Sequence, residues 1–356
     1  MGFMNSKILI ALSGGVDSSV AAHLLKSAGH DLIGAMMKLY SGEDSNHRGC
    51  CTLSDAEDAR AVATSMGIPF FVFNFTDTFD TEVMERFVNA YQQGLTPNPC
   101  IDCNRFLKFQ RFLHRAAELE CDYIATGHYA RISQENGRFL LKTGLDATKD
   151  QSYVLYAMTQ PQLSRTLLPL GEFTKEEVRN IALEQSFVNA KKRDSQDICF
   201  APDGDYAGFI ERYTNAPIKK GDFIDKSGKT IGEHKGIINY TIGQRKGLGL
   251  YNPQPLYVLN LNAQDNTVTV GASEDLFKKS LTANDINLIP MDKIDGSLRV
   301  QAKIRYAHSP APATLWQTDE NTIQVEFDTP QRAISPGQAV VLYDGETVIG
   351  GGTITA

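Results

Sequence analysis

Long apolar runs are missing from this sequence of 356 residues. No stretch reaches the roughly 20 apolar residues that a transmembrane helix needs, and the residues before Lys7 do not form the core of a secretory signal. We therefore expect a soluble, cytoplasmic protein that does not bind a membrane. Repeats and low-complexity tracts are missing too, and with 42% hydrophobic and 22% charged residues the composition is that of a globular chain. At roughly 150 residues per domain, two or three domains are expected.

Cysteine is scarce, and an excess of positive charge is missing. The six cysteines are too few and too unevenly placed for a disulfide scaffold, so in a reducing compartment they indicate catalysis or metal binding. The net charge is −7, which excludes the overall electrostatic footprint of a nucleic-acid-binding protein. Local patches remain available, because residues 186–250 contain 11 basic and 8 acidic residues, a local charge of +3.

The first part of the chain alternates short apolar runs with segments of helical periodicity, which predicts an α/β domain with a parallel sheet. The expected strands are Lys7–Leu12, Leu32–Leu39, Pro69–Phe75 and Tyr123–Thr126. The expected helices are Asp17–Ala28, Ser54–Met66, Thr78–Gln93 and Asn104–Leu119. Ser54 with Glu57 forms the pattern of a capping box at the start of the second helix.

The pattern of expected secondary structure changes after about residue 130. The Asn136-Gly137 pair predicts a hairpin within Arg131–Thr143, a helical stretch is expected from Gln151 to Leu163, and Thr174 is the expected cap of another helix. Beyond about Ala201, short β-like runs separated by turn residues indicate two small all-β modules. We therefore expect an α/β domain over residues 1–200, a central β-rich domain over 201–280 and a β-barrel-like domain over 281–356.

The strongest local signal is Ser13-Gly14-Gly15-Val16-Asp17-Ser18-Ser19, which lies between the first expected strand and the first expected helix. Glycines let backbone amides approach a ligand, serine hydroxyls donate further hydrogen bonds, and the start of a helix offers unpaired N–H groups with a positive dipole end. Such a loop binds phosphate. It lacks the lysine of a P-loop and the third glycine of a dinucleotide fingerprint.

This loop resembles that of the PP-loop ATP pyrophosphatases, whose fold is an adenine-nucleotide alpha-hydrolase-like parallel sheet. The resemblance implies that ATP adenylates an acceptor oxygen and releases pyrophosphate. It leaves the acceptor open, because enzymes that act on very different substrates share the loop.

Two cysteine segments carry the next signals, Thr96-Pro-Asn-Pro-Cys100-Ile-Asp-Cys103 and Asp194-Ser-Gln-Asp-Ile-Cys199. Cys103 is expected at the start of a helix, where the dipole favours the thiolate. Cys100-x-x-Cys103 is compatible with a redox pair, half of a zinc site, or part of an iron–sulfur site completed by Cys199 or by Cys50-Cys51 with His47. A closed zinc site is less favoured than thiol chemistry, because a second Cys-x-x-Cys is missing.

Taken together, these segments resemble the bacterial tRNA-specific 2-thiouridylases over nearly the whole chain. The resemblance also rests on Thr126-Gly127-His128-Tyr129, Lys149-Asp150-Gln151-Ser152-Tyr153, residues 236–249 and Lys303-Ile-Arg305-Tyr306. It implies an enzyme, a tRNA-uridine 2-sulfurtransferase, that adenylates the C2 oxygen of the wobble uridine with ATP and replaces that oxygen with sulfur. Mg²⁺ is expected with ATP, but no cluster of carboxylates in the sequence identifies its ligands.

The resemblance also implies roles for individual residues. Cys199 would carry a persulfide delivered by a sulfur-relay protein or a cysteine desulfurase, and Cys103 would act on it as nucleophile or base, with a transient Cys103–Cys199 disulfide as one route. Nucleotide contacts are implied for Ala11, Leu12, Ser13, Gly14, Gly15, Val16, Asp17, Ser18, Met37 and Gly127. Contacts with tRNA are implied for Asn98, Pro99, Cys100, Lys149, Asp150, Gln151, Arg305 and Tyr306.

Cys50, Cys51 and Cys121 match no catalytic position of the family, and Cys121 is most simply a core thiol. Two other classes of function remain open. A PP-loop ligase acting on a small molecule would use the phosphate loop but leave Cys103 and Cys199 without a role. An RNA-binding module that only senses ATP would need neither cysteine.

Overall fold

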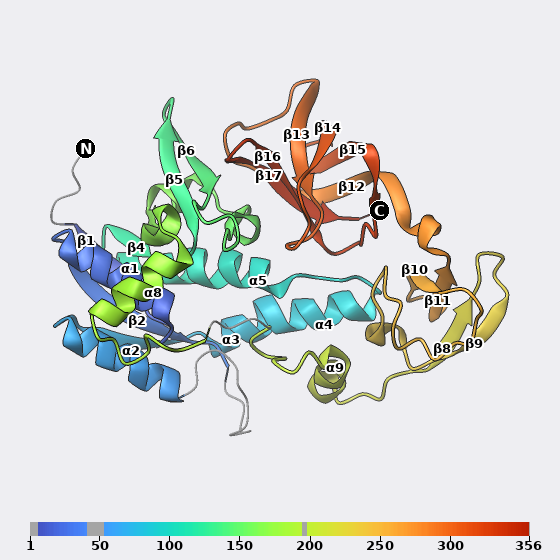
Figure 1. Cartoon of the computed structure of the whole chain (residues 1–356), viewed down its shortest axis with the longest axis horizontal. Coiled ribbons are helices and arrows are strands. Elements are labelled where there is room, and N and C mark those ends of the chain that lie inside the picture. The colour runs from blue at the N-terminus through green and yellow to red at the C-terminus, as the bar shows by residue number, and fades with distance from the viewer. Residues whose placement is uncertain (1–5, 41–52, 194–197, 356) are drawn as a thin grey trace. The chain divides into compact units, whose positions relative to one another are not determined.

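The computed structural model describes residues 6–40, 53–193 and 198–355 (Figure 1). The chain divides into two compact units. Unit 1 comprises the described residues of Met1–Val83, Cys100–Asp203 and Glu346–Val348. Unit 2 comprises those of Met84–Pro99, Gly204–Gly345 and Ile349–Ala356. The expected fold class, a parallel α/β domain followed by β-rich modules, is confirmed.

Unit 1 is built on a parallel sheet in the order β3-β2-β1-β4-β7. Its strands are β1 (Lys7–Ala11), β2 (Asp31–Lys38), β3 (Phe70–Asn74), β4 (Tyr123–Ala125) and β7 (Thr166–Leu167). The central strand β1 reads as a continuous apolar run because both of its faces are covered, and Ile8, Leu9 and Ile10 are fully buried. Four of the five strands were expected. The two-residue β7 is too short to leave a pattern in the sequence.

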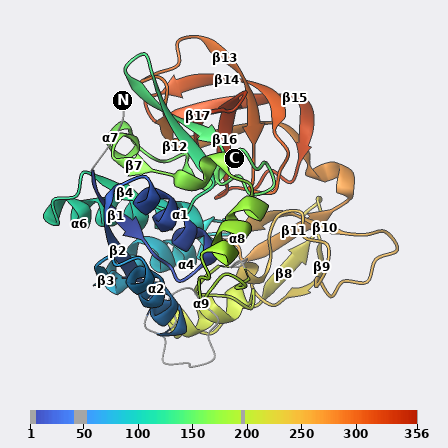
Figure 2. The same ribbon diagram turned by 60° about the vertical axis from the view of Figure 1, so that its left-hand side comes forward.

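Three α-helices of unit 1 match expected helices, namely α1 (Val16–Ser27), α2 (Leu53–Ser65) and α8 (Lys175–Glu184). Helices α1 and α8 lie side by side, and Val20 and Val178 belong to the same core (Figures 1 and 2). Thr174 caps α8 as expected, since its hydroxyl accepts from the Glu177 amide at 3.3 Å while Glu177 Oε2 accepts from the Thr174 amide at 2.7 Å. The cap expected at Ser54 is wrong, because α2 already includes Leu53.

Two expected long helices are interrupted by π-helical turns. The first consists of α3 (Thr76–Phe79), the π-helical η1 (Asp80–Met84) and α4 (Glu85–Gln92). The second consists of α5 (Pro99–Asp102), the π-helical η2 (Cys103–Arg111) and α6 (Phe112–Glu118). The periodicity predicted helical conformation correctly but carried no sign of these π turns, which in proteins are frequent at functional sites.

The hairpin expected around Asn136-Gly137 is confirmed as β5 (Ala130–Glu135) and β6 (Arg138–Thr143), which project from the sheet in Figure 1. Both turn residues have positive φ angles, 49° and 81°, as a two-residue hairpin turn requires. The continuous helix expected from Gln151 to Leu163 is wrong. This stretch forms a 3₁₀ turn, η3 (Ser152–Leu155), and a separate α7 (Gln160–Ser164), because Pro161 is accepted only in the first turn of a helix. A further 3₁₀ turn, η4 (Pro169–Glu172), precedes α8.

Unit 2 contains a small sheet in the order β10-β11-β8-β9. Its strands are β8 (Gly221–Ile224), β9 (Thr230–His234), β10 (Tyr257–Asn262) and β11 (Thr267–Gly271), with the 3₁₀ turns η5 (Ile237–Asn239) and η6 (Ser273–Leu276). Phe223, Tyr240 and Val258 fill its core. Helix α9 (Tyr206–Thr214) precedes this sheet, so the expectation of β structure alone beyond Ala201 is wrong at this point.

The last part of the chain forms six strands in the order β12-β15-β14-β13-β16-β17, and β12 also pairs with β17 (Figure 2). The strands are β12 (Phe277–Leu288), β13 (Ser297–Lys303), β14 (Ala311–Asp319), β15 (Thr322–Arg332), β16 (Ala339–Asp344) and β17 (Thr347–Ile354). In β15, Ile323, Val325 and Phe327 are fully buried while the residues between them are exposed. This alternation marks the inside and outside of a closed barrel.

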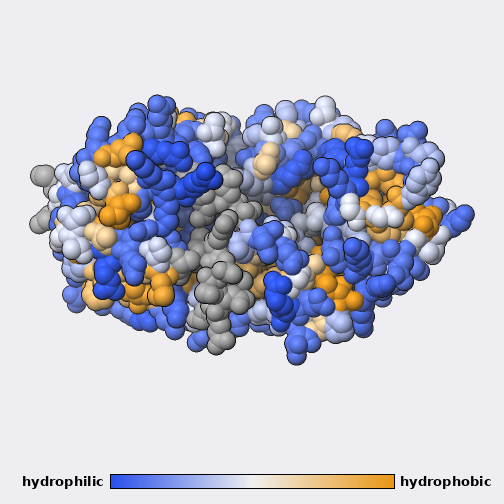
Figure 3. Space-filling model, turned by 60° about the horizontal axis from the view of Figure 1, so that its bottom comes forward, coloured by the Kyte–Doolittle hydropathy of each residue, from blue (hydrophilic) through white to orange (hydrophobic). Residues whose placement is uncertain are grey.

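The surface drawn in Figure 3 is mostly hydrophilic, with hydrophobic residues in small scattered patches. Scattered apolar residues of this kind are ordinary for a protein surface and identify no docking site. Within the described ranges, no helix is long and apolar enough to span a bilayer.

Candidate active site

The phosphate loop joins the carboxyl end of β1 to the start of α1, as expected. Ser18 braces the loop from inside the helix, because its Oγ accepts from the Ser13 amide at 3.2 Å and donates to the Gly15 carbonyl at 3.0 Å. Gly14 has a φ of +75°, and a side chain there would collide with the Asp55 carbonyl. The loop is thus fixed before any ligand binds, and the amides at the start of α1 are of the kind that binds anions.

The peptide at Gly14 is held from behind by two residues of a distant segment. Asn189 Nδ2 donates to the Gly14 carbonyl and to Ser19 Oγ, both at 3.0 Å. Lys192 Nζ donates to the same carbonyl at 3.2 Å and to carboxylate oxygens of Asp55 and Asp58 at 2.6 Å each. Partial burial works to lower the pKa of Lys192, but the hydrogen bonds to the two carboxylates outweigh it and raise that pKa.

The role of Lys192 differs from the one that its sequence context suggested. The run Lys191-Lys192-Arg193 has the composition of a phosphate-tracking patch. In the structure, Lys192 pairs with two carboxylates beneath the phosphate loop, whereas Lys191 and Arg193 are exposed. Sequence reasoning also missed Asn189, because nothing in its local pattern marks it as a neighbour of Gly14.

The carboxylate of Asp17 is engaged by two buried residues. Lys175 Nζ lies 2.6 and 2.8 Å from its two oxygens, and the Tyr129 hydroxyl donates to Oδ1 at 2.8 Å. Lys175 is 8% exposed and Tyr129 2%. Lys175, the first residue of α8, therefore neutralises the one carboxylate of the loop. Its proximity to the loop had no sequence signal.

Gly127 follows β4 and lies directly against the first turn of α1. A Cβ at this position would stand 2.8 Å from the Ser18 amide nitrogen and 2.9 Å from the Asp17 carbonyl carbon. Glycine at position 127 thus permits a close approach of its backbone to α1. Met37 lies on strand β2, on the other side of β1, and is 9% exposed. Ala11, Leu12 and Val16 are likewise buried, so they could offer a ligand mainly backbone groups.

His128 is buried beside this edge of the sheet and is 8% exposed. Its Nδ1 lies 2.8 Å from Thr126 Oγ1, and its Nε2 lies 3.5 Å from Lys108 Nζ. Burial, and then the positive charge of Lys108, lower the pKa of His128 well below its usual value. The ring is therefore neutral at pH 7 and connects the carboxyl end of β4 with η2.

Cys103 is the first residue of η2 but does not start a helix. Helical structure begins with α5 at Pro99, so the expected position at a helix N-terminus is wrong. The dipole effect is confined to the first turn, which holds the exposed Cys100, whereas Cys103 is only 9% exposed. The neighbouring Asn104 is 3% exposed, and its Nδ2 donates to the Val154 carbonyl at 3.2 Å.

Cys199 is half-buried, and its segment contacts the same short helix as η2. The next residue, Phe200, packs edge-on against Phe79 of α3 with ring centroids 5.8 Å apart. Arg111 of η2 donates to Thr78 Oγ1 of α3 at 3.3 Å. Helix α3 is therefore a common neighbour of both cysteine-bearing segments. Residues 194–197, together with Cys50, Cys51 and His47, lie outside the described residues.

The residues expected to contact tRNA lie in both units. In unit 1, Asp150 Oδ1 accepts from the amides of Gly144 and Ser152 at 3.0 and 3.1 Å, and Gln151 Oε1 accepts from the Tyr129 amide at 3.0 Å. These two side chains shape the turn, and Lys149 is half-buried beside them. Cys100 also belongs to unit 1.

In unit 2, Arg305 Nη1 donates to the Arg332 carbonyl at 3.2 Å, while Tyr306 is 45% exposed with Lys303 Nζ 5.8 Å from its ring centroid. Asn98 is half-buried and Pro99 buried in the same unit. Thr96, two residues before Asn98, is tied to the barrel segment, because its amide donates to the Pro336 carbonyl at 2.9 Å.

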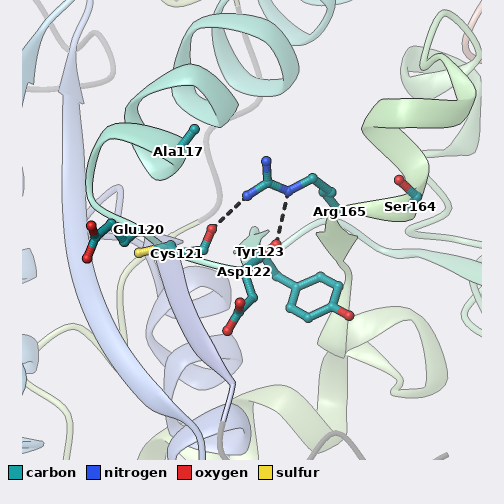
Figure 4. Close-up of a pocket in the computed structure, with 7 residues that line it drawn as sticks. All are labelled: Ala117, Glu120, Cys121, Asp122, Tyr123, Ser164 and Arg165. Atoms are coloured by element: carbon teal, nitrogen blue, oxygen red, sulfur yellow. Dashed lines mark hydrogen bonds between the residues drawn. The ribbon is translucent and has the colours of Figure 1, made fainter.

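A large open hollow, of about 530 Å³, lies away from this chemistry at the amino ends of β4 and β7 (Figure 4). Arg165 crosses it and donates to the carbonyls of Cys121 at 2.7 Å and Asp122 at 3.1 Å. Cys121 is 3% exposed, and burial raises the pKa of its thiol, as expected of a core cysteine. Among the residues that the structure describes, no group of three metal-ligating side chains is present.

Comparison with known proteins identifies the family. Residues 6–203 match the model of the tRNA methyl transferase HUP domain, 207–272 that of the tRNA methyl transferase PRC-barrel domain, and 278–354 that of the aminomethyltransferase beta-barrel domain. A solved structure of a 4-thiouridine synthetase–RNA complex with bound ATP covers 59% of this chain and 50% of its own at 18% identity and a TM-score of 0.38, too distant a likeness to carry an argument.

Relatives match over nearly the full length. The tRNA-specific 2-thiouridylase MnmA of Clostridioides difficile is 51% identical over 99% of both chains. The protein of that name from Lachnoclostridium phytofermentans is 50% identical over 98% of this chain and 99% of its own. The chain therefore belongs to the family of the tRNA-specific 2-thiouridylases.

Proposed function

We propose that this protein is an ATP-dependent tRNA-uridine 2-sulfurtransferase that converts the wobble uridine of tRNA to 2-thiouridine in the cytoplasm. The observation that carries the proposal is the identity of about half of all residues with 2-thiouridylases over 99% of both chains. The braced phosphate loop and the two cysteine segments beside α3 supply the chemistry that such a reaction needs. We divide the chain for this purpose at residues 200 and 280 into catalytic, central tRNA-contacting and C-terminal domains.

The first step is adenylation of the uridine. The C2 oxygen of the base attacks the α-phosphorus of ATP, and the bond to the β-phosphate oxygen breaks, so that pyrophosphate leaves. The loop Ser13–Ser18 binds the departing pyrophosphate through backbone amides and hydroxyls. Ala11, Leu12, Met37 and Gly127 line the rest of the nucleotide site. Mg²⁺ would be held with ATP mainly by phosphate oxygens and water, since phosphate-bound Mg²⁺ needs few protein ligands. The carboxylate of Asp17, the single one in the loop, is engaged by Lys175 and Tyr129.

The second step is sulfur transfer. A sulfur-relay protein or a cysteine desulfurase delivers sulfur to Cys199 as a persulfide. Its terminal sulfur attacks C2 and AMP leaves with the former C2 oxygen. The Cys103 thiolate then attacks Cys199 Sγ, the S–S bond breaks, and the transferred sulfur remains on C2. The resulting Cys103–Cys199 disulfide is reduced by an external dithiol. In the other route, Cys103 acts as a base that deprotonates the persulfide, an external thiol attacks Cys199 Sγ, and the S–S bond breaks. Hydrosulfide then leaves to attack C2, and Cys199 remains in a mixed disulfide that a second external thiol reduces.

Binding of tRNA positions the base for both steps. Asn98, Pro99 and Cys100 contact the target nucleotide, and Lys149, Asp150, Gln151, Arg305 and Tyr306 contact the surrounding RNA. The base must leave its stack to reach the phosphate loop. Because the whole chain carries −7 charges, contact with the RNA backbone depends on local basic residues, such as those within 186–250.

The test uses purified protein with tRNA, ATP, Mg²⁺ and a sulfide or persulfide source. Cys103→Ser and Cys199→Ser are expected to abolish 2-thiouridine formation while ATP binding survives. Cys121→Ser is the matched control, since that buried thiol lies at the opposite edge of the sheet, and it should retain activity. Full thiolation by either active-site variant would defeat these roles. ATP turnover to AMP with an amino acid or ammonia and without tRNA would favour the small-molecule ligase instead.

A further inference from the structure

Two residues connect the phosphate loop to another part of unit 1. Lys175 and Tyr129 both grip the carboxylate of Asp17, with bonds of 2.6 and 2.8 Å from Lys175 and 2.8 Å from the tyrosine hydroxyl. Both are more than nine-tenths buried. Asp17 belongs to the first turn of α1, so any movement of that turn on nucleotide binding changes the surroundings of these two side chains.

The backbone of the same two residues holds the turn formed by residues 146–151. The Tyr129 amide donates to Gln151 Oε1 at 3.0 Å, and the Gln151 amide donates back to the Tyr129 carbonyl at 2.9 Å. The Lys175 amide donates to Asp146 Oδ2 at 3.0 Å. These bonds hold the turn at both of its ends, at Asp146 and at Gln151. The Thr148 hydroxyl, followed by the Lys175 amide, lowers the pKa of Asp146.

Each of the two residues therefore makes a side-chain bond to the phosphate loop and a backbone bond to the turn. We propose that Lys175 and Tyr129 are positioning residues that couple ATP binding at the phosphate loop to tRNA binding at residues 146–151. This inference rests on the proposed function, because Lys149–Gln151 is the segment assigned there to tRNA. The coupling is reciprocal: ATP tightens tRNA binding by the same factor by which tRNA tightens ATP binding.

Such coupling would reduce the hydrolysis of ATP in the absence of tRNA. Adenylation of the base needs both substrates in place, and an ATP site that is completed only when tRNA is bound limits hydrolysis of ATP by water. Shared contacts alone do not prove that the two sites are coupled. Coupling is demonstrated when the affinity for ATP and the affinity for tRNA change together. The measurement must therefore follow the coupling factor and not activity alone.

The experiment compares the dissociation constant of a non-hydrolysable ATP analogue with Mg²⁺, by calorimetry, in the absence and presence of saturating unmodified tRNA. We expect the wild-type constant to fall about fivefold or more when tRNA is bound. Tyr129→Phe removes one hydroxyl and should reduce this factor, and Lys175→Met should bring it close to one. Lys142→Met is the matched control. Lys142 forms an ion pair with Glu135 at 2.6 Å in the same hairpin, and its loss should leave the factor unchanged.

The outcomes separate coupling from stability. If Lys175 and Tyr129 have a purely structural role, their variants should bind both ligands more weakly but keep the wild-type coupling factor. That result would overturn the proposal. A coupling factor of one in the wild-type protein would overturn it as well. If Lys175→Met does not fold, Tyr129→Phe still decides, because its ring and packing remain. Wild-type protein that couples the two ligands but forms no 2-thiouridine would contradict the proposed function and not the coupling.

Discussion

In the parallel sheet of unit 1, the edge where the strands begin (the amino edge) and the edge where they end (the carboxyl edge) differ in how their polar groups are used. At the amino edge, the hollow of about 530 Å³ is crossed by Arg165, which donates to the carbonyls of Cys121 and Asp122. At the carboxyl edge, buried Lys175, Asn189 and His128 converge on the phosphate loop and its surroundings. The comparison teaches that convergent buried polar groups at strand carboxyl ends, and not the size of a hollow, identify the site.

The largest effect is expected from Gly127→Ala at the carboxyl edge. The added methyl would stand 2.8 Å from the Ser18 amide nitrogen, so the first turn of α1 must shift. Overpacking of this kind costs about 1–3 kcal/mol, and if that cost falls on the ATP-bound state, ATP binding weakens about fivefold to 140-fold. Calorimetric titration with ATP measures it. Ser164→Ala at the amino edge is the control, and equal ATP affinities of the two variants would remove the distinction between the edges.

Asp17→Asn should have the next largest effect. The amide keeps the size of the side chain but removes the charge that pairs with buried Lys175, so the first turn of α1 is held less firmly. We expect pyrophosphate release in the presence of tRNA to slow roughly tenfold, or about 1.4 kcal/mol. A coupled pyrophosphate assay checks this. Release at the wild-type rate would show that the pair with Lys175 contributes nothing to adenylation.

Arg165→Gln tests the amino edge directly. The substitution removes hydrogen bonds from a charged donor to two backbone carbonyls, so the free energy of unfolding should fall by about 1–2 kcal/mol. Thiolation at a temperature where the variant is folded should match the wild type. Urea unfolding and single-turnover thiolation give the two values. If the variant has normal stability but impaired thiolation, Arg165 takes part in the reaction, and the purely structural role that we assign to the amino edge is wrong.

The smallest effect concerns pH. Burial, and then the charge of Lys108, lower the pKa of His128 in the folded protein. Below about pH 6.5, His128 is therefore protonated in the unfolded chain but stays neutral in the folded protein. The free energy of unfolding should therefore fall as the pH drops from 7.5 to 5.5, by at most about 1.4 kcal/mol per pH unit for this group. His128→Gln should flatten this slope in urea unfolding series. An identical slope in variant and wild type would contradict the neutral buried ring.

Local sequence patterns were enough to predict most of the fold, but they predicted little of the side-chain packing around the phosphate loop. The apolar runs predicted four strands, the Asn136-Gly137 pair predicted its hairpin, and Thr174 predicted its helix. The phosphate loop was recognisable because all of its residues are contiguous. Lys175 and Asn189 were missed because their partners lie 158 and 175 residues away in the sequence. The π-helical η2 was missed because it keeps the apolar pattern of an α-helix. The start at Pro99, one turn before Cys103, was missed as well.

The central claim is that this carboxyl edge serves 2-thiolation of tRNA. Mass spectrometry of nucleosides from cells that lack this protein, with and without the wild-type chain restored, tests the claim most directly. We predict that 2-thiouridine derivatives at the wobble position disappear without the protein, return with the wild-type chain, and do not return with Cys199→Ser. Unchanged 2-thiouridine in the deleted cells would contradict the account and assign the loop to another adenylation.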